Sequence, residues 1–141
     1  GPNDYFDAKN SHVIPGLINR MHKATIDGEE VFKIWGTGEP KREFMQVDDL
    51  ASAIDYIIEN KVLEPLINIG SNEEVTIKEL ALLLKEIIGF SGDIEFDKNM
   101  PDGNPRKLLD STMIRNFGWV PEIDLNSGLE QTYKWYLDNK D

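Results

Sequence analysis

The segment from Thr76 to Gly89 carries helix signals at both ends, and it constrains the fold more than any other part of the chain. Thr76 and Glu79 have the spacing of a capping box, in which a hydroxyl and a carboxylate each accept a backbone N–H at the start of a helix. Gly89 is the residue type that most often ends a helix. The pattern predicts an amphipathic helix whose buried face consists of Ile77, Leu80, Ala81, Leu84, Ile87 and Ile88.

Four further helices are predicted from caps and apolar periodicity. Ser11 is expected to cap the first, which tolerates Pro15 in its first turn and ends before Asp27-Gly28. Asp48-Asp49 is expected to cap the second, which extends to Asn60. A short helix over residues 111–117 and a final amphipathic helix complete the set. The apolar positions of the three longer helices are Ile14, Leu17, Ile18 and Met21; Leu50, Ala53, Ile54, Ile57 and Ile58; and Leu129, Thr132, Tyr133, Tyr136 and Leu137.

Short apolar segments between these helices predict three strands. Residues 31–35 alternate in polarity, residues 66–69 are expected to form a short buried strand, and residues 94–96 form another candidate. Because strands and helices alternate along the chain, the predicted class is α/β or α+β. We find no internal repeat or low-complexity tract in the sequence.

Composition excludes several classes of partner. With 141 residues the chain is long enough for one domain with a real core. Its 26 acidic and 15 basic residues give a net charge of −11, which repels nucleic acids and anionic membranes. No apolar run is long enough to span a bilayer, and no signal-peptide pattern occurs at the start, so we expect a soluble protein. The absence of cysteine fits a cytoplasmic location, and two histidines make a metal site improbable.

Two basic segments, each following a predicted strand, are the best candidates for a binding site. Residues 35–44 contain Lys41 and Arg42, and residues 100–110 contain Arg106 and Lys107 beside the turn pair Asp102-Gly103. Arginine offers a planar fork and lysine a compact charge, and both suit phosphate. Either segment alone is typical of an ordinary solvated turn. Together they predict a loop site for a phosphorylated, hydroxyl-rich ligand.

Three motifs occur in one order: Ser11-His12-Val13-Ile14-Pro15, then residues 35–49 with Gly36, Gly38, Pro40, Arg42 and the sequence Val47-Asp48-Asp49, then Pro101-Asp102-Gly103 followed by Pro105-Arg106-Lys107. In this arrangement the chain resembles the GDP-L-fucose synthases, a family of extended short-chain dehydrogenases in the NAD(P)-binding Rossmann-like superfamily. The resemblance covers essentially the whole chain but only the second half of such an enzyme. It implies an α/β fold that is the C-terminal, substrate-binding part, with the main cofactor-binding Rossmann portion absent from these residues.

Two departures from the family pattern limit what these residues can do. The sequence has no glycine-rich cofactor loop and no Tyr-x-x-x-Lys pair, and Tyr133 does not supply one because residue 137 is leucine. Gln46 stands where the family usually carries histidine, which puts any role of that position in doubt. Gly1-Pro2 is compatible with native sequence or with an expression remnant.

The resemblance assigns roles to six residues. His12 matches the histidine that lies near the nicotinamide and donates a proton during epimerisation, so it is both a catalytic and a cofactor-binding candidate. Arg20, roughly 12 Å further along the same helix, together with Arg42 and Lys107, is implied at the substrate diphosphate. Arg106 is a weaker candidate. The last two positions, implied at the nucleotide or sugar, are Trp35 and Asp102.

Each of these residues also has a simpler interpretation. His12 could be an incidental polar residue before a helix, Arg20 a surface arginine, Trp35 a core residue at a strand end, and Asp102 a turn residue. Trp119 and Trp135 are expected to serve packing alone.

The resemblance also implies an activity and its partners. The family converts GDP-4-keto-6-deoxy-mannose to GDP-fucose by epimerising two carbons and reducing the ketone with NADPH. We expect a GDP-sugar substrate, NADP bound mainly by an N-terminal portion, a homodimer in the full-length enzyme, no activity of these residues alone, and neither nucleic-acid nor membrane partners. Two alternatives stay open: another NAD(P)-dependent nucleotide-sugar epimerase, dehydratase or reductase, and a noncatalytic nucleotide-sugar-binding or assembly module.

The domain organisation follows from the same resemblance. Residues 1–141 form one substrate-binding domain, of which about residues 43–70 are expected to pack on the Rossmann sheet of the N-terminal portion. Without that sheet, an apolar surface should be exposed for self-association or for the N-terminal portion. Its expected members are Leu50, Ile54, Ile57, Ile67 and Ile69.

Overall fold

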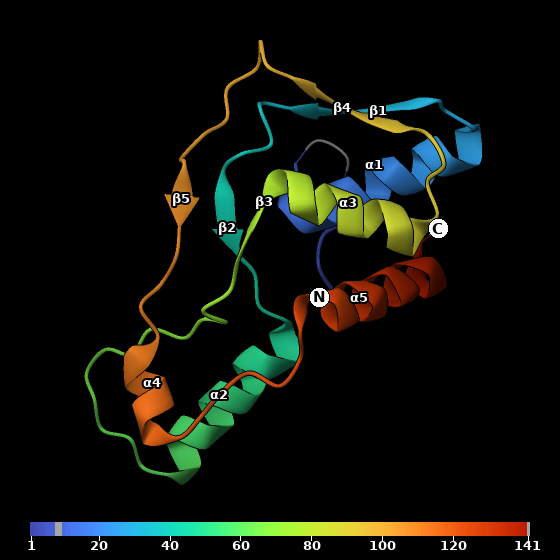
Figure 1. The fold of residues 1–141 in the computed structure, drawn as a ribbon. Helices are drawn as coiled ribbons and strands as arrows, with labels where there is room; N and C mark the ends of the chain where they lie inside the picture. Colours follow the sequence, from blue (N-terminus) through green and yellow to red (C-terminus); the bar gives the residue numbers. More distant parts are fainter. Residues whose placement is uncertain (8–9, 141) are drawn as a thin grey trace.

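The computed structural model describes residues 1–7 and 10–140, which form an α/β fold with a larger body and a projecting arm (Figure 1). Three helices and a two-stranded parallel sheet make up the body. These are α1 (Val13–Asp27), α3 (Ile77–Ile88), α5 (Leu125–Asn139), β1 (Val31–Trp35) and β4 (Asp93–Asp97). The sheet register runs from Val31 opposite Asp93 to Trp35 opposite Asp97. No helix in the described ranges is long and apolar enough to cross a membrane.

The capped helix predicted from Thr76 to Gly89 is confirmed. The Thr76 hydroxyl accepts the N–H of Glu79 at 3.0 Å, and the Glu79 carboxylate accepts the N–H of Thr76 at 2.7 Å. Gly89 ends the helix with a φ of 78°, a left-handed conformation that glycine adopts without strain. The predicted strands at residues 31–35 and 94–96 and the two C-terminal helices are confirmed as well.

Two predicted helix caps are wrong. His12, not Ser11, is the cap residue of α1, and the Ser11 hydroxyl instead donates to the carbonyl of Asp7 at 2.5 Å. That helix also continues through Asp27 and ends at Gly28. Gln46 caps α2 (Val47–Glu59), because its side-chain oxygen accepts the N–H of Asp48 at 2.5 Å. The two aspartates lie within the first turn of α2, where their negative charge suits the helix N-terminus.

Residues 66–69 do not form the predicted buried strand. Leu66 and Asn68 are exposed, Ile67 and Ile69 are half-buried, and no described strand pairs with this segment. An isolated apolar segment without a ladder partner has no reason to stay in a strand conformation.

A second sheet was missed by the sequence analysis. It contains β2 (Lys41–Glu43), β3 (Glu74–Thr76) and β5 (Arg106–Lys107), in the order β3-β2-β5. Strand β2 is antiparallel to β3 and parallel to β5. Two of these short strands lie inside the basic segments that were predicted to be loops, so the sheet joins those segments directly.

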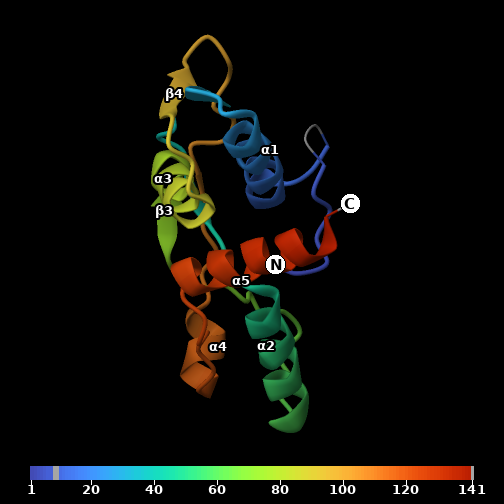
Figure 2. The same cartoon turned by 90° about the vertical axis from the view of Figure 1, so that its right-hand side faces the viewer.

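The apolar core divides between body and arm. The body encloses one cluster built from α1, α3, α5 and β1, with Ile18, Met21, Leu80, Leu84 and Leu129 almost fully buried. The α2–α4 arm comprises residues 47–70 and 111–120, with α4 at Thr112–Phe117. The arm also points away from the body in the view turned by 90° (Figure 2). Its apolar cluster is small, and the buried members are Ala53, Ile114 and Trp119.

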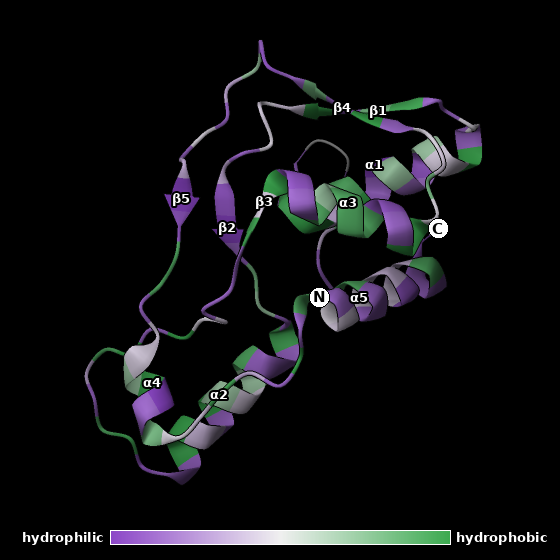
Figure 3. Cartoon of the chain, in the orientation of Figure 1, coloured by the Kyte–Doolittle hydropathy of each residue, from purple (hydrophilic) through white to green (hydrophobic). Residues whose placement is uncertain are grey.

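The arm carries exposed apolar side chains. Figure 3 shows hydrophobic residues in green along α2 and the segment that follows it. The prediction of an exposed apolar surface is confirmed for Leu50 and Ile54. It is wrong in degree for Ile57, Ile67 and Ile69, which are half-buried because they pack against the small cluster of the arm. Further exposed apolar side chains of the arm are Val47, Ile58, Leu63, Leu66, Met113 and Phe117.

Candidate functional site

One open cavity of about 720 Å³ brings together five of the six predicted site residues. Its volume lies within the range of about 300–1,000 Å³ that is usual for small-ligand pockets. Helix α1, strands β1 and β2, the start of α3 and the segment before β5 contribute to its wall. The predicted site residues that line it are His12, Arg20, Trp35, Arg42 and Asp102, and they are joined by apolar neighbours such as Leu17, Ile34 and Ile77.

The sixth residue, Lys107, is brought beside the cavity by the β2–β5 ladder. It is the register partner of Arg42, and both strands run in the same direction. Register partners of neighbouring strands project from the same face of a sheet, so the exposed Lys107 side chain is on the side of Arg42. The two basic segments, 65 residues apart at this pair, therefore converge on one place.

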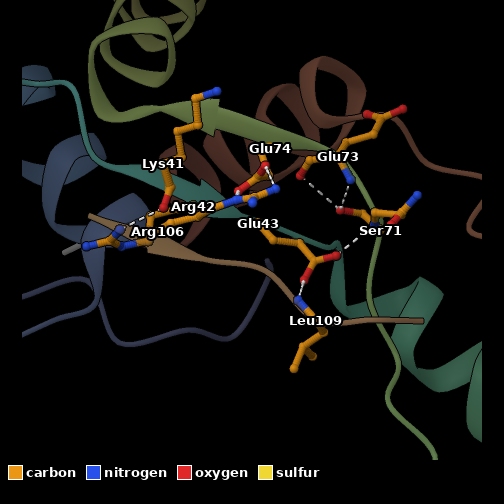
Figure 4. Close-up of polar contacts among 9 residues, drawn as sticks. Lys41, Arg42, Glu43, Ser71, Glu73, Glu74, Arg106 and Leu109 are labelled. Carbon is orange, nitrogen blue, oxygen red and sulfur yellow. Dashed lines mark hydrogen bonds and ion pairs between the residues drawn. The ribbon is translucent and has the colours of Figure 1, made fainter. Parts of the chain in front are cut away.

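Arg106 is on the other face of this sheet. Its guanidinium makes a two-pronged contact with the Glu74 carboxylate, with both N···O distances at 2.7 Å (Figure 4). This ion pair raises the pKa of Arg106 and lowers the pKa of Glu74. Arg106 thus joins β5 to β3 across β2 and is turned away from Arg42, whose own guanidinium donates to the Lys41 carbonyl at 2.7 Å.

Arg20 lies on the cavity side of α1 and is half-buried. Its guanidinium carbon is 5.2 Å from the centroid of the Phe32 ring, and one of its nitrogens is 3.4 Å from the carbonyl of Lys33. Burial lowers the pKa of Arg20, but arginine stays protonated in proteins. The side chain is therefore a charged group resting on an aromatic face of β1, with part of it open to the cavity.

His12 and Trp35 have exposed rings at the cavity. His12 is the N-terminal cap residue of α1 and is exposed. Trp35 ends β1 and is 69% exposed, whereas its neighbour Ile34 is buried, as strand alternation requires. The interpretation of Trp35 as a core residue is therefore wrong, and its ring is available to a ligand.

Asp102 joins the two basic segments through Thr37. One carboxylate oxygen accepts the backbone N–H of Thr37 at 2.6 Å, and the other accepts the Thr37 hydroxyl at 2.8 Å. Gly36 has a φ of 85°, and a Cβ at this position would collide with Oδ1 of Asp102, so only glycine permits this approach. Thr37 is not among the predicted site residues, and its sole local signal is its position between two glycines that end a strand.

Tyr133, Gln46 and the two remaining tryptophans have structural roles. The Tyr133 hydroxyl is 2.9 Å from Nδ1 of His22, between α1 and α5 and outside the cavity wall. Burial and the charge of Lys140, which contacts the second ring nitrogen, lower the pKa of His22. Gln46 is buried and caps α2. The packing role of the two remaining tryptophans is confirmed: Trp119 is buried, and Trp135 stacks on Phe6.

The described residues do not build a dinucleotide site by themselves. Such a site places a glycine-rich turn between a strand and a helix, so that the helix N-terminus meets the pyrophosphate. Strand β3 is followed directly by α3, whose N-terminus is closed by its capping box. The connections from β2 to α2 (residues 44–46) and from β5 to α4 (residues 108–111) contain no glycine. No group of three or more metal-binding side chains occurs in the described part of the chain either.

The chain is similar in sequence to known proteins of one family. Residues 1–70 match the NAD dependent epimerase/dehydratase family. The chain is 50% identical over 139 residues to GDP-L-fucose synthase 1 of Arabidopsis thaliana, covering 99% of this chain and 43% of that protein. It is 40% identical over 141 residues to GDP-L-colitose synthase of Yersinia pseudotuberculosis, covering 99% of this chain and 46% of that protein.

A solved structure extends the similarity to the fold. The GDP-L-fucose synthetase of Naegleria fowleri bound to NADP matches with a TM-score of 0.90 and 26% identity, over 99% of this chain and 44% of that one. The chain thus spans less than half the length of each of these three relatives. It belongs to the NAD dependent epimerase/dehydratase family, as an α/β portion of an extended short-chain dehydrogenase.

Proposed function

We propose that this chain is the substrate-binding portion of an NADP-dependent GDP-L-fucose synthase and that its cavity binds the GDP-sugar. The observation that carries the proposal is the convergence of the predicted site residues, five of them on one cavity wall and Lys107 in register with Arg42. In a chain of net charge −11, two arginines in the cavity wall and a lysine in register with one of them would attract an anionic ligand.

Different side chains of the site would bind different parts of the ligand. Arg20, Arg42 and Lys107 would bind the diphosphate, since charge-assisted hydrogen bonds to phosphate are among the strongest that side chains form. Trp35 would offer a flat apolar face to the nucleotide or sugar, and Asp102 would accept from hydroxyl groups, in exchange for or beside Thr37.

His12 would act as the proton donor during epimerisation of the sugar. It caps the N-terminus of α1 at the edge of the cavity, where its exposed ring can contact a bound ligand. NADPH, held mainly by an N-terminal portion of the enzyme, would supply the hydride for the reduction.

The arm has a part in the same proposal. Residues 43–70 would pack on the sheet of the cofactor-binding portion and cover the apolar side chains that the arm exposes. The whole enzyme would be a cytoplasmic homodimer, and this chain alone would bind substrate without turning it over.

A second candidate is a synthase for a different GDP-sugar, and the 40% identity to a GDP-L-colitose synthase favours it. The diphosphate contacts proposed above would be the same for both, since the difference lies in the sugar. Turnover of a panel of GDP-4-keto sugars by the full-length protein would separate the two. A nucleotide-sugar-binding module without catalysis would bind GDP and turn over none of the panel.

Calorimetric titration of the 141-residue chain with GDP tests the shared part of the proposal. Arg42→Ala and Lys107→Ala should each weaken GDP binding by about tenfold, because each removes one charge-assisted contact worth about 1.5–3 kcal/mol less the energy recovered by solvation. Lys134→Ala, which removes an exposed cation from α5, is the matched control and should leave the affinity within about twofold. Unchanged affinity in both cavity variants would contradict the proposal.

A further inference from the structure

Lys107 is held beside Arg42 with little help from apolar packing. Every residue from 101 to 110 is exposed, and β5 contributes two residues to the ladder. A long exposed segment has many conformations to lose, so it needs specific contacts to stay in one of them. In the described structure these contacts are polar, and they attach the segment at its start, middle and end.

The contact at the end of the segment belongs to Glu43, the residue after Arg42 in β2. One of its carboxylate oxygens accepts the backbone N–H of Leu109 at 3.0 Å, and the other accepts the backbone N–H of Asn72 at 2.7 Å (Figure 4). Glu43 therefore ties β2 to two segments that are distant in sequence. Leu109 is two residues beyond Lys107, so this contact fixes the direction in which the chain leaves β5.

The backbone around this carboxylate leaves room for it. A Cβ on Gly70 would lie 2.5 Å from Oε1 of Glu43, so the glycine admits the carboxylate where any side chain would displace it. Gly70 is not among the glycines with positive φ, so its backbone does not need glycine for conformational reasons. The close approach to Glu43 is the reason we find for glycine at this position.

The Arg106–Glu74 ion pair does not explain the placement of Lys107 equally well. That pair lies on the face of the sheet opposite Lys107 and joins β5 to β3, so it holds the start of β5 and not the chain beyond Lys107. The Glu43 carboxylate contacts the backbone two residues beyond Lys107, and hydrogen bonds to a charged acceptor are among the stronger ones that a side chain makes.

We propose that Glu43 is a positioning residue, whose carboxylate holds the end of β5 so that Lys107 and Arg42 act on the same phosphorylated ligand. This role rests on the proposed function, because the register of the two cations matters only if the cavity binds phosphate. The positioning role and simple electrostatics predict opposite effects of Glu43→Gln on GDP binding. Glu43→Gln removes a negative charge next to the cations, so simple electrostatics predicts tighter binding of an anion, whereas loss of positioning predicts weaker binding.

The test is calorimetric titration of the 141-residue chain with GDP, arranged as a double-mutant cycle. Glu43→Gln should weaken GDP binding by about tenfold, and in the background of Lys107→Ala it should change the affinity by less than about twofold, since the positioned group is gone. The control Glu86→Gln removes one exposed carboxylate from α3 and should not weaken binding. Equal losses in both backgrounds, or tighter binding by Glu43→Gln, would overturn the role.

Gly70→Ala provides a second variant that keeps the carboxylate and displaces it. It should reproduce the weakening seen with Glu43→Gln, and full GDP affinity in this variant would count against positioning. If the unmodified chain binds no GDP, the proposed function fails for these residues, and hydrogen exchange decides on Glu43 separately. The amides of Leu109 and Asn72 should then exchange at least about tenfold faster in Glu43→Gln than in the unmodified chain. Unchanged exchange would refute the positioning role on its own.

Discussion

The body and the α2–α4 arm are held together by different forces. The body buries apolar side chains of three helices and a strand against one another, whereas the apolar cluster of the arm has three buried members and many apolar side chains of the arm are exposed. The cavity is lined by elements of the body and by β2 and the segment before β5, and none of its lining residues belongs to the arm. The binding site is therefore built on the well-packed part of the chain, and the arm is free to serve a contact.

Polar contacts compensate for the small core of the arm. The buried Asp49 carboxylate accepts the N–H groups of Glu122 and Ile123 at 3.0 and 3.1 Å. The indole of Trp119 donates to the Ser52 hydroxyl at 3.0 Å, and Arg115 donates to the carbonyl of Ser71 at 2.6 Å. The contacts of Asp49 and Arg115 fix the arm to the segments beside it, and the contact between Trp119 and Ser52 joins the two parts of the arm. The stability of the arm should therefore depend on individual hydrogen bonds more than that of the body does.

The largest effect is expected from a cavity in the core of the body. Leu84 and Ile114 are both 0% exposed, one in the body and one in the arm. Leu84→Ala should lower the free energy of unfolding by about 2–5 kcal/mol, and Ile114→Ala by about half as much, because the half-exposed neighbours of Ile114 can relax into the space. Equilibrium unfolding in urea measures both, with Leu82→Ala on the exposed side of α3 as control. Equal costs for the two core variants would show that the arm is packed as tightly as the body.

An intermediate effect is expected at the joint between arm and body. Asp49→Ala leaves two backbone N–H groups without their acceptor and should cost about 2–3 kcal/mol. Hydrogen exchange should show faster exchange in α2 while α3 keeps its protection, since the arm opens first. Asp55→Ala, exposed on the same helix, controls for the loss of charge. If α2 and α3 lose protection together, arm and body unfold as one unit and the distinction between them is wrong.

Local signals were sufficient for the body and insufficient for the second sheet. Capping, periodicity and glycine punctuation identify α3 and β1 because these features act between near neighbours in sequence. Strands β2 and β5 are too short to show alternation, and their ladder joins residues 65 apart. A pairing over that separation leaves no pattern in one sequence, so two segments with real strand structure resembled loops.

The same limit applies to the candidate site. Residue type and family resemblance selected His12, Arg20, Trp35, Arg42 and Asp102, all of which line the cavity. The resemblance ranked Lys107 above Arg106, but residue type alone did not separate these two adjacent cations, because they differ in the face of the sheet that each occupies. Thr37 and Glu43 were missed for a related reason: a carboxylate or hydroxyl that holds a distant backbone is recognisable only when the partner segment is in place.

The smallest effect on stability is expected at the exposed apolar surface of the arm. Substitutions there also test most directly whether the arm contacts another protein surface. Ile54 on α2 and Leu82 on α3 are each 46% exposed, so replacing either by lysine should change the free energy of unfolding by less than about 0.5–1 kcal/mol. Their effects on association should differ. Ile54 has exposed apolar neighbours, Leu50 and Ile58, on the same helix, and contiguous apolar surface favours contact with another protein surface. Ile54→Lys should therefore reduce concentration-dependent association in sedimentation velocity, and Leu82→Lys should reduce it less. If both variants and the unmodified chain sediment as the same monomer at all concentrations, the exposed side chains do not drive self-association, and a contact with a cofactor-binding portion would be the remaining role for them.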